Sequence, residues 1–337
     1  MRVLRVIILM ISICGGSLCT AASSVRHLGD KTDAAEEELL AEIKTHVFGA
    51  IIPSDEKGFV RLGVPKQDEW LSVYRETPQT FELYRLAARV RPTATRHTIV
   101  LQPLGRVDVS LLEAMREYAE IFFQFPARVA APIELDGQDN SSLMRRLPAG
   151  HRHGVYDRQY NADKILTDVL EPHLPDDAIV CLGITMADIY SDDLNYVFGL
   201  GSLEQRVGVY SLCRYFPEFW GEKRKEGDDI IGLRRAFKVL SHETGHMFGL
   251  THCVFYQCAM NGTNNLGETD KSPMEYCPLC HRKLLWNIGF DPEKRYVALE
   301  AFYRKNQLIE EADWMRKRIR NWKDVTEIEK GRHIKDE

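Results

Sequence analysis

The run from residue 242 to residue 280 constrains this chain more than any other stretch, because it concentrates histidines and cysteines at metal-ligand spacing. Two histidines spaced by four lie one turn apart on one helix face, so both imidazoles can bind the same ion. A glycine after them can adopt a left-handed conformation, which ends the helix and returns a third histidine to that ion. Three protein ligands leave a fourth position for water, as in catalytic zinc sites. The pattern H-E-x-x-H-x-x-G-x-x-H is supplied by His242, Glu243, His246, Gly249 and His252.

The glutamate of this pattern indicates the chemistry. Zinc lowers the pKa of bound water to about 7 and polarises a substrate carbonyl. A carboxylate beside the first histidine, here Glu243, can take the proton of that water and deliver it to the leaving amine. The pattern therefore predicts metal-assisted amide hydrolysis. The alternative, a helix with solvated histidines, does not explain why Gly249 and His252 occur together at this spacing.

Four cysteines follow the histidines and predict a second, structural zinc ion, so that we expect two zinc ions per chain. They are Cys253, Cys258, Cys277 and Cys280, and the last pair forms a C-x-x-C turn like that of a zinc knuckle. Two disulfides are the alternative in an oxidising compartment. Neighbouring residues of an extended chain point to opposite sides, so His252 and Cys253 can bind different ions. The cysteine site would then anchor the third histidine.

At these residues the sequence resembles the archaemetzincins, zinc metallopeptidases of the metzincin clan. The family pattern continues from the third histidine directly into a cysteine, then C-x-M and a final C-x-x-C, and Met260 supplies the methionine. The resemblance extends over residues 60–305 and implies that Met260 lies in a tight turn beneath the histidines. It also implies action on small or neutral peptides, in the manner of an aminopeptidase.

The implied fold is an α/β (α+β, metzincin-like) fold with a twisted mixed sheet, an active-site helix and a smaller helical C-terminal subdomain. Alternating strand-like and helix-like segments before the metal site favour a mostly parallel sheet. The continuous apolar run at 178–185 predicts a strand buried on both faces. We expect strands at 97–104, 128–135, 178–185, 196–203 and 206–213, and helices at 69–89 (interrupted at Pro78), 109–125, 160–174, 229–250, 282–288, 292–306 and 310–322.

The two short strands at 196–203 and 206–213 raise a functional question. An exposed sheet edge can bind an extended peptide as an added strand. An ordinary hairpin is the alternative that the residues leave open. The family resemblance favours the peptide-binding edge.

The N-terminal residues predict export. Arg2 and Arg5 precede an apolar run from Val6 to Ile13, and small residues follow, which is the pattern of a cleavable signal peptide at 1–22. The run is too short for an ordinary membrane span, although an uncleaved anchor is the alternative. We expect an N-terminal extension or propeptide at 23–60 and a charged tail at 323–337. The catalytic domain would span 61–322, with its zinc-cluster subdomain from about residue 250.

The net charge limits the classes of partner that this chain is expected to bind. The net charge of −5 favours neither nucleic acid nor an anionic membrane, and no stable membrane insertion is expected once the signal is removed. Cys181 and Cys213 lie in apolar runs and are either buried thiols or a disulfide. The partner indicated is a peptide or protein substrate. A second hypothesis is a non-catalytic, zinc-stabilised peptide-binding module of the same fold, against which the intact Glu243 argues.

Overall fold

The computed structural model describes residues 58–136, 142–148, 150, 152–153, 156–192 and 194–333, with the backbone alone for 322–333. The expected signal peptide and nearly all of the expected N-terminal extension lie outside these residues. Within the described part of the chain, we find no helix with the length and apolar character that crossing a bilayer requires.

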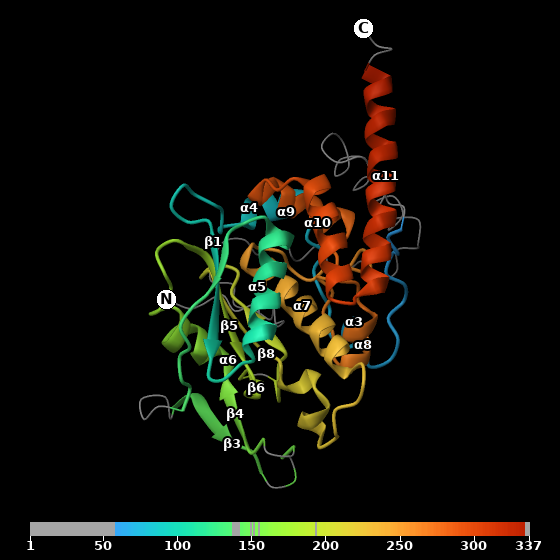
Figure 1. Cartoon of the computed structure of the whole chain (residues 1–337). Coiled ribbons are helices and arrows are strands. Elements are labelled where there is room, and N and C mark those ends of the chain that lie inside the picture. Colours follow the sequence, from blue (N-terminus) through green and yellow to red (C-terminus); the bar gives the residue numbers. More distant parts are fainter. Residues whose placement is uncertain are drawn as a thin grey trace, which may run out of the picture.

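A five-stranded mixed sheet in the order β2-β1-β5-β8-β7 forms the centre of the structure (Figure 1). Neighbouring strands are parallel except at the edge strand β7, which runs antiparallel to β8. Every residue of β5 is buried, as its continuous apolar sequence predicts. The predicted mixed, mostly parallel sheet is confirmed. Its strands are β1 (Thr98–Leu104), β2 (Ala127–Val129), β5 (Ala178–Thr185), β7 (Gly199–Gly201) and β8 (Val207–Ser211).

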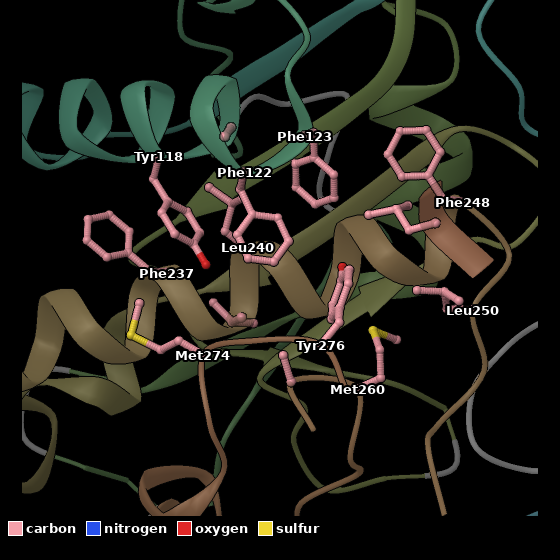
Figure 2. Packing of buried hydrophobic residues seen from close by; sticks show 14 of the residues in the cluster. Tyr118, Phe122, Phe123, Phe237, Leu240, Phe248, Leu250, Met260, Met274 and Tyr276 are labelled. Carbon is pink, nitrogen blue, oxygen red and sulfur yellow. The ribbon is translucent and has the colours of Figure 1, made fainter. Parts of the chain in front are cut away.

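Two helices, α5 (Val109–Phe123) and α7 (Asp228–Met247), lie side by side against this sheet (Figure 1). Tyr118 of α5 stacks on Phe237 of α7 with ring centroids 4.6 Å apart. Figure 2 shows that the other side of α7 is covered by side chains from the segment that follows the histidines. Aromatic pairs of this kind add about 0.5–1.5 kcal/mol beyond the burial of their area. This packing fixes the helix that carries the first two histidines.

The N-terminal part of the described chain and the C-terminal helices complete the fold. The helix expected at 69–89 is interrupted around Pro78 as predicted, forming α3 (Trp70–Val73) and α4 (Phe81–Ala87). The last helix does not end at residue 322: its backbone stays helical into the expected charged tail, and it extends beyond the body of the molecule (Figure 1). The C-terminal helices are α8 (Leu266–Lys271), α9 (Pro278–Ile288), α10 (Pro292–Lys305) and α11 (Ile309–His333).

The predicted helix at 160–174 is wrong at its start. The chain there forms a strand, β4, and then a short α-turn that passes into a π-helix. The side chain of Gln159 donates a 2.8 Å hydrogen bond to the buried carboxylate of Asp188, and this tertiary contact overrides the helical periodicity. The elements are β3 (Met144–Arg146), β4 (Arg158–Asn161), α6 (Ala162–Lys164), η4 (Ile165–Leu170) and β6 (Ile189–Tyr190), and β3-β4-β6 form a second, small sheet.

The strand predicted at 128–135 is also too long, because β2 ends at Val129. Only an isolated parallel bridge between Leu104 and Ile133 continues the pairing. Pro132 has no backbone N–H to donate, so a continuous ladder cannot pass through it.

Two short 3₁₀ helices connect β8 to α7. They are η5 (Cys213–Tyr215) and η6 (Pro217–Trp220).

Candidate active site and metal centre

The three histidines of the motif converge on one point. Their ligand atoms lie within 4.8 Å of one another, and the Nε2 atoms of His242 and His246 are 3.0 Å apart. His242 and His246 project from one face of α7, and His252 comes from the chain that turns back after the helix. Burial, followed by the neighbouring imidazoles, holds the pKa of His246 well below its usual range. The neutral form that a metal ligand requires is therefore favoured at this position.

Each Nδ1 atom of the three rings meets a hydrogen-bond acceptor. The carbonyl of Ala259 lies 2.7 Å from the Nδ1 of His242, and the carbonyl of Leu250 lies 2.7 Å from the Nδ1 of His246. Because carbonyls only accept, they select the Nδ1–H tautomer and leave Nε2 free to bind a metal. Three oriented nitrogen donors and one open position fit a catalytic zinc ion.

The turn after α7 has the conformation that the sequence predicts. Gly249 has φ of +88°, in the left-handed region, and α7 itself ends at Met247 rather than at residue 250. A β-carbon on Gly249 would in addition lie 3.2 Å from the Cα of Ala88. This turn brings His252 back to the other two rings.

Met260 lies beneath the histidine pair, as the family resemblance implies. It is fully buried, and a β-carbon on Gly245, between the two helical histidines, would overlap its sulfur. Figure 2 shows Met260 and Tyr276 together against α7. The Tyr276 hydroxyl donates a 2.6 Å hydrogen bond to the carbonyl of Ser241 and so ties this segment to the helix.

The Glu243 side chain is buried against the edge strand β7. Gly201 donates a backbone hydrogen bond to its carboxylate, while burial, the larger effect, raises its pKa to about 8. A β-carbon on Gly199 would overlap the carboxylate, and one on Gly201 would lie 2.7 Å from the Glu243 carbonyl. Glycine at both positions therefore allows the helix and the strand edge to approach each other. The bulk of any other residue there would displace Glu243.

The four cysteines form a second compact group. All four are buried, and their Sγ atoms lie within 4.8 Å of one another. The Sγ atoms of Cys253 and Cys277 are 3.6 Å apart, well beyond the roughly 2.05 Å of a disulfide bond. Backbone N–H groups of Met260 and Cys277 donate to the Sγ of Cys258 at 3.4 Å and 3.2 Å. Four free thiols with donors aimed at sulfur fit a tetrahedral zinc ion rather than two disulfides.

The two groups share one loop, which we call the cysteine loop (residues 253–261). Its first residue, Cys253, directly follows His252 and donates a backbone hydrogen bond of 2.8 Å to the carbonyl of Met260. The same loop supplies the Ala259 carbonyl that orients His242. Asn261, part of a glycosylation sequon in the sequence, closes the loop through its side-chain amide, which donates to the carbonyls of Cys253 and Tyr256 at 2.7 Å and 2.9 Å.

A cleft of about 300 Å³ opens onto the histidines and Glu243. The edge strand β7 and the segment before it form one wall, and the chain after the cysteine loop forms another. Trp70 and Tyr74, stacked with ring centroids 4.0 Å apart, line it beside His252. The cleft can therefore hold a peptide segment against the metal-binding group.

Comparison with known proteins identifies the family. The model of peptidase family M54 matches residues 139–285. Archaemetzincin-2 of Rattus norvegicus is 31% identical over 301 residues, covering 80% of this chain and 79% of the relative. The chain belongs to the archaemetzincin family. It is thus a zinc metallopeptidase, and the predictions of family and enzyme class are confirmed.

Two further matches come from archaea. The archaemetzincin of Thermococcus kodakarensis is 32% identical over 190 residues, which cover 56% of this chain and 96% of the relative. A crystal structure of the archaemetzincin from Archaeoglobus fulgidus, complexed with malonate, is 26% identical and aligns with a TM-score of 0.43 over 55% of this chain and 99% of that chain.

One residue of this archaemetzincin's site escapes prediction from the sequence. Glu76 accepts a hydrogen bond from the Nδ1 of His252 at 2.8 Å and another from the Trp70 indole at 2.9 Å. It therefore orients the third histidine as the carbonyls orient the first two. Nothing in the sequence signals the contact, because Glu76 precedes His252 by 176 residues and belongs to no metal motif.

The Glu76 contact leads to a prediction. Glu76→Gln should weaken zinc binding at the histidines by about 10- to 100-fold, because the charged partner of His252 is lost. Competition with a zinc-binding dye would measure the affinity. Glu69→Gln is the matched control, because this half-buried carboxylate of the same segment bonds only the backbone of Lys66 among the described residues. Equal zinc affinity in the Glu76 and Glu69 variants would show that Glu76 does not support the metal ligand.

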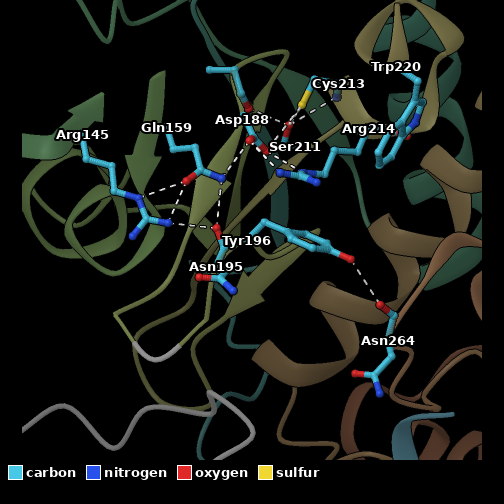
Figure 3. A network of polar contacts seen from close by, with 11 residues as sticks. Arg145, Gln159, Asp188, Asn195, Tyr196, Ser211, Cys213, Arg214, Trp220 and Asn264 are labelled. Carbon is cyan, nitrogen blue, oxygen red and sulfur yellow. Dashed lines mark hydrogen bonds and ion pairs between the residues drawn. The ribbon is translucent and has the colours of Figure 1, made fainter. Parts of the chain in front are cut away.

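A buried polar network stands behind the cleft wall (Figure 3). Arg214 forms a two-pronged ion pair with Asp188 at 2.7 Å and 2.8 Å, and its guanidinium stacks on the Tyr196 ring at 3.8 Å. The Tyr196 hydroxyl reaches the carbonyl of Asn264 at 3.3 Å on the opposite wall. The network thus fixes an aromatic side chain that spans the cleft.

The two remaining cysteines are buried free thiols. Cys181 lies inside β5, and Cys213 begins η5 beside Ser211. Burial raises the pKa of both thiols to about 12, so neither is a reactive thiolate. Of the two alternatives that the sequence leaves open, the structure has the buried thiols.

Proposed function

We propose that this metallopeptidase cleaves peptide bonds at the histidine centre with Glu243 as general base and then general acid. The observation that supports the proposal is the position of the Glu243 carboxylate, which lies in the cleft wall beside three converging imidazoles. Zinc, when held by His242, His246 and His252, supplies an activated water and polarises the substrate carbonyl. Glu243 takes the proton of the attacking water and returns it to the leaving amine.

The role of Glu243 depends on its hydrogen bond to the edge strand. The backbone N–H of Gly201 donates a hydrogen bond to the Glu243 carboxylate. This bond holds the carboxylate in place and opposes the increase in its pKa that burial causes. The positive charge of a metal ion at the histidines would oppose that increase further, favouring the ionised form. The carboxylate would then be able to accept a proton near neutral pH.

The second part of the proposal concerns the metal content. We infer two zinc ions per chain, one at the histidines and one held by Cys253, Cys258, Cys277 and Cys280. Burial raises the pKa of Cys258 and Cys277 well above its usual value, whereas hydrogen bonds from the neighbouring thiols lower the pKa of Cys253. A bound dication would stabilise all four sulfurs as thiolates. This second ion would have a structural role, because four protein ligands leave no open position.

The edge strand β7 is suited to bind the substrate backbone. Among the described strands it pairs only with β8, and Gly199 and Leu200 line the cleft. An extended peptide could add to its open side as a further strand and lie across the histidines. The substrates that the family resemblance implies are small or neutral peptides, cleaved from the amino end.

The place of action is a separate part of the proposal. The N-terminal pattern of residues 1–22 supports export through a cleavable signal peptide and no stable membrane insertion afterwards. N-terminal sequencing of protein recovered from the medium of an expressing cell should give a first residue at 22 or 23. Retention of the protein in the cell with residues 1–22 intact would contradict export.

A peptide library tests the catalytic proposal against the alternative, a peptide-binding module without activity. Zinc-loaded protein should cleave members of the library, lose that activity on chelation and regain it when zinc is restored. Metal analysis should return two zinc ions per chain. Peptide binding without cleavage of any library member would favour the binding module, and a single zinc ion would contradict the cysteine site.

A further inference from the structure

One end of the cleft carries a buried cation. Lys238 lies on α7 four residues before His242, and this spacing places both side chains on one helix face. Lys238 lines the cleft, yet only 6% of its surface is exposed. Buried lysines are rare unless they meet a partner. The groups around this ammonium therefore affect which substrates the cleft can bind.

Backbone carbonyls accept hydrogen bonds from the Lys238 ammonium group, but no carboxylate of the described residues forms an ion pair with it. Its Nζ donates to the carbonyls of Thr269 and Asp270, both at 2.9 Å, near the C-terminal end of α8. The Asp270 carboxylate is engaged by Arg235 through two bonds of 2.8 Å and 2.7 Å. Within the described ranges, no ion pair joins Lys238 to a carboxylate. An ammonium group has three donors, so one N–H remains for a ligand.

The surroundings of Lys238 suit a small anionic group. Thr263, Thr269 and Ser272 line the cleft together with Lys238, and we call these four residues the polar end of the cleft. The hydroxyls of Thr263 and Thr269 are 2.9 Å apart. The Thr269 hydroxyl donates to the Asn265 carbonyl at 3.1 Å, and the Ser272 hydroxyl donates to the Glu268 carbonyl at 3.2 Å. The Lys238 ammonium is therefore the group at this end with an N–H left to donate to a carboxylate.

We propose that the polar end of the cleft binds a carboxylate of the peptide substrate, with Lys238 as the residue that determines this specificity. The carboxylate is either an acidic side chain next to the cleaved bond or the free C-terminus of a short peptide. The inference rests on the proposed peptidase function. It narrows the substrates of the same site from the small or neutral peptides that the family resemblance implies to small peptides with a carboxylate near the cleaved bond. Lys238 lies one helical turn from His242, so the bound carboxylate would belong to a residue close to that bond.

A purely structural role for Lys238 predicts a different result. If Lys238 served only to hold α8 through its two carbonyl contacts, its removal would affect all peptides alike. A role in recognition instead changes the ratio between a peptide with a carboxylate and its neutral counterpart. Burial lowers the pKa of Lys238 to about 8, so the assays belong near pH 6.5, where the ammonium form predominates.

The experiment measures kcat/KM for pairs of peptides that differ only by Glu against Gln on either side of the cleaved bond. A second series compares free C-terminal acids with C-terminal amides. The wild type should prefer the peptide with the carboxylate by about 10- to 100-fold, the range of a charge-assisted hydrogen bond. Lys238→Met should bring that ratio close to 1, and Lys238→Arg, which keeps the charge, should retain a preference. Lys271→Met, in an exposed lysine of α8, is the matched control and should keep the wild-type ratio.

The outcomes separate this inference from the function on which it rests. A Glu preference identifies an acidic side chain as the bound group, and a preference for free acids identifies the C-terminus. If Lys238→Met slows acidic and neutral peptides equally, or if the wild type shows no preference, the inference is overturned while the peptidase function stands. Failure of the wild type to cleave any peptide would contradict the proposed function, and the inference with it.

Discussion

Replacing Glu243 by glutamine is expected to lower kcat/KM for peptide hydrolysis by about 10²- to 10⁴-fold, the usual contribution of a general base. Glutamine has nearly the same shape as glutamate and can still accept the backbone hydrogen bond from Gly201, but it cannot take up a proton. The three histidines are unchanged, so the zinc content should remain that of the wild type. Steady-state kinetics and metal analysis of the same preparation measure the two quantities.

The control for this experiment is Glu204→Gln. Glu204 is an exposed carboxylate in the turn that follows β7 and does not line the cleft. Its substitution should leave both kcat/KM and zinc content unchanged. Hydrolysis at the wild-type rate by the Glu243 variant would refute the proposed mechanism. Loss of zinc together with activity would instead mean that Glu243 acts by supporting the metal site.

The part of the site that lies close together in sequence could be predicted from spacing alone. His242 and His246 share a helix face because of the helical repeat, and Gly249 permits the turn that returns His252. Each of these relations depends on the backbone of a single short segment. Met260 was identified only through the family resemblance, since a buried methionine has no metal-binding pattern of its own.

The contacts that complete the site come from distant segments and could not be predicted in this way. Glu76 reaches His252 from the N-terminal part of the chain, and Gly201 reaches Glu243 from the edge of the sheet. Sequence patterns report local periodicity, whereas these contacts depend on how complete elements pack. Gly199 and Gly201 are a signal in the sequence for the contact with Glu243, because glycine inside a strand often marks a close approach of another group.

The misplaced start of the helix predicted at 160–174 has the same origin. Residues 158–161 form a strand because Gln159 is committed to the buried Asp188 network (Figure 3), and the apolar periodicity that follows belongs to a helical segment that starts later. α11 continues past residue 322 although its sequence there is rich in charge. Charge alone does not end a helix when good helix formers are present. The elements predicted most closely are β1, α5 and β5, in which the apolar pattern is continuous.

Cys277→Ser should remove the second zinc ion and also weaken zinc binding at the histidines. Cys277 is one of the four clustered thiols and caps the first turn of α9, where its sulfur accepts from the Cys280 N–H at 3.5 Å. Without a metal the cysteine loop loses its anchor, and with it the position of the Ala259 carbonyl that orients His242. Loss of such an orienting partner reduces metal affinity by about 10- to 100-fold.

Metal analysis should show loss of the cysteine-bound ion, and titration of the remaining site should show the weaker affinity. Structural zinc sites contribute about 10–16 kcal/mol in small zinc-binding peptides, so a lower melting temperature is expected as well. Cys181→Ala is the matched control, because it removes a buried thiol of β5 that lies outside the cluster. It should cost stability through lost packing while both zinc ions remain bound. If the histidine site of the Cys277 variant bound zinc as tightly as the wild type, the two centres would be independent, and the cysteine loop would serve folding alone.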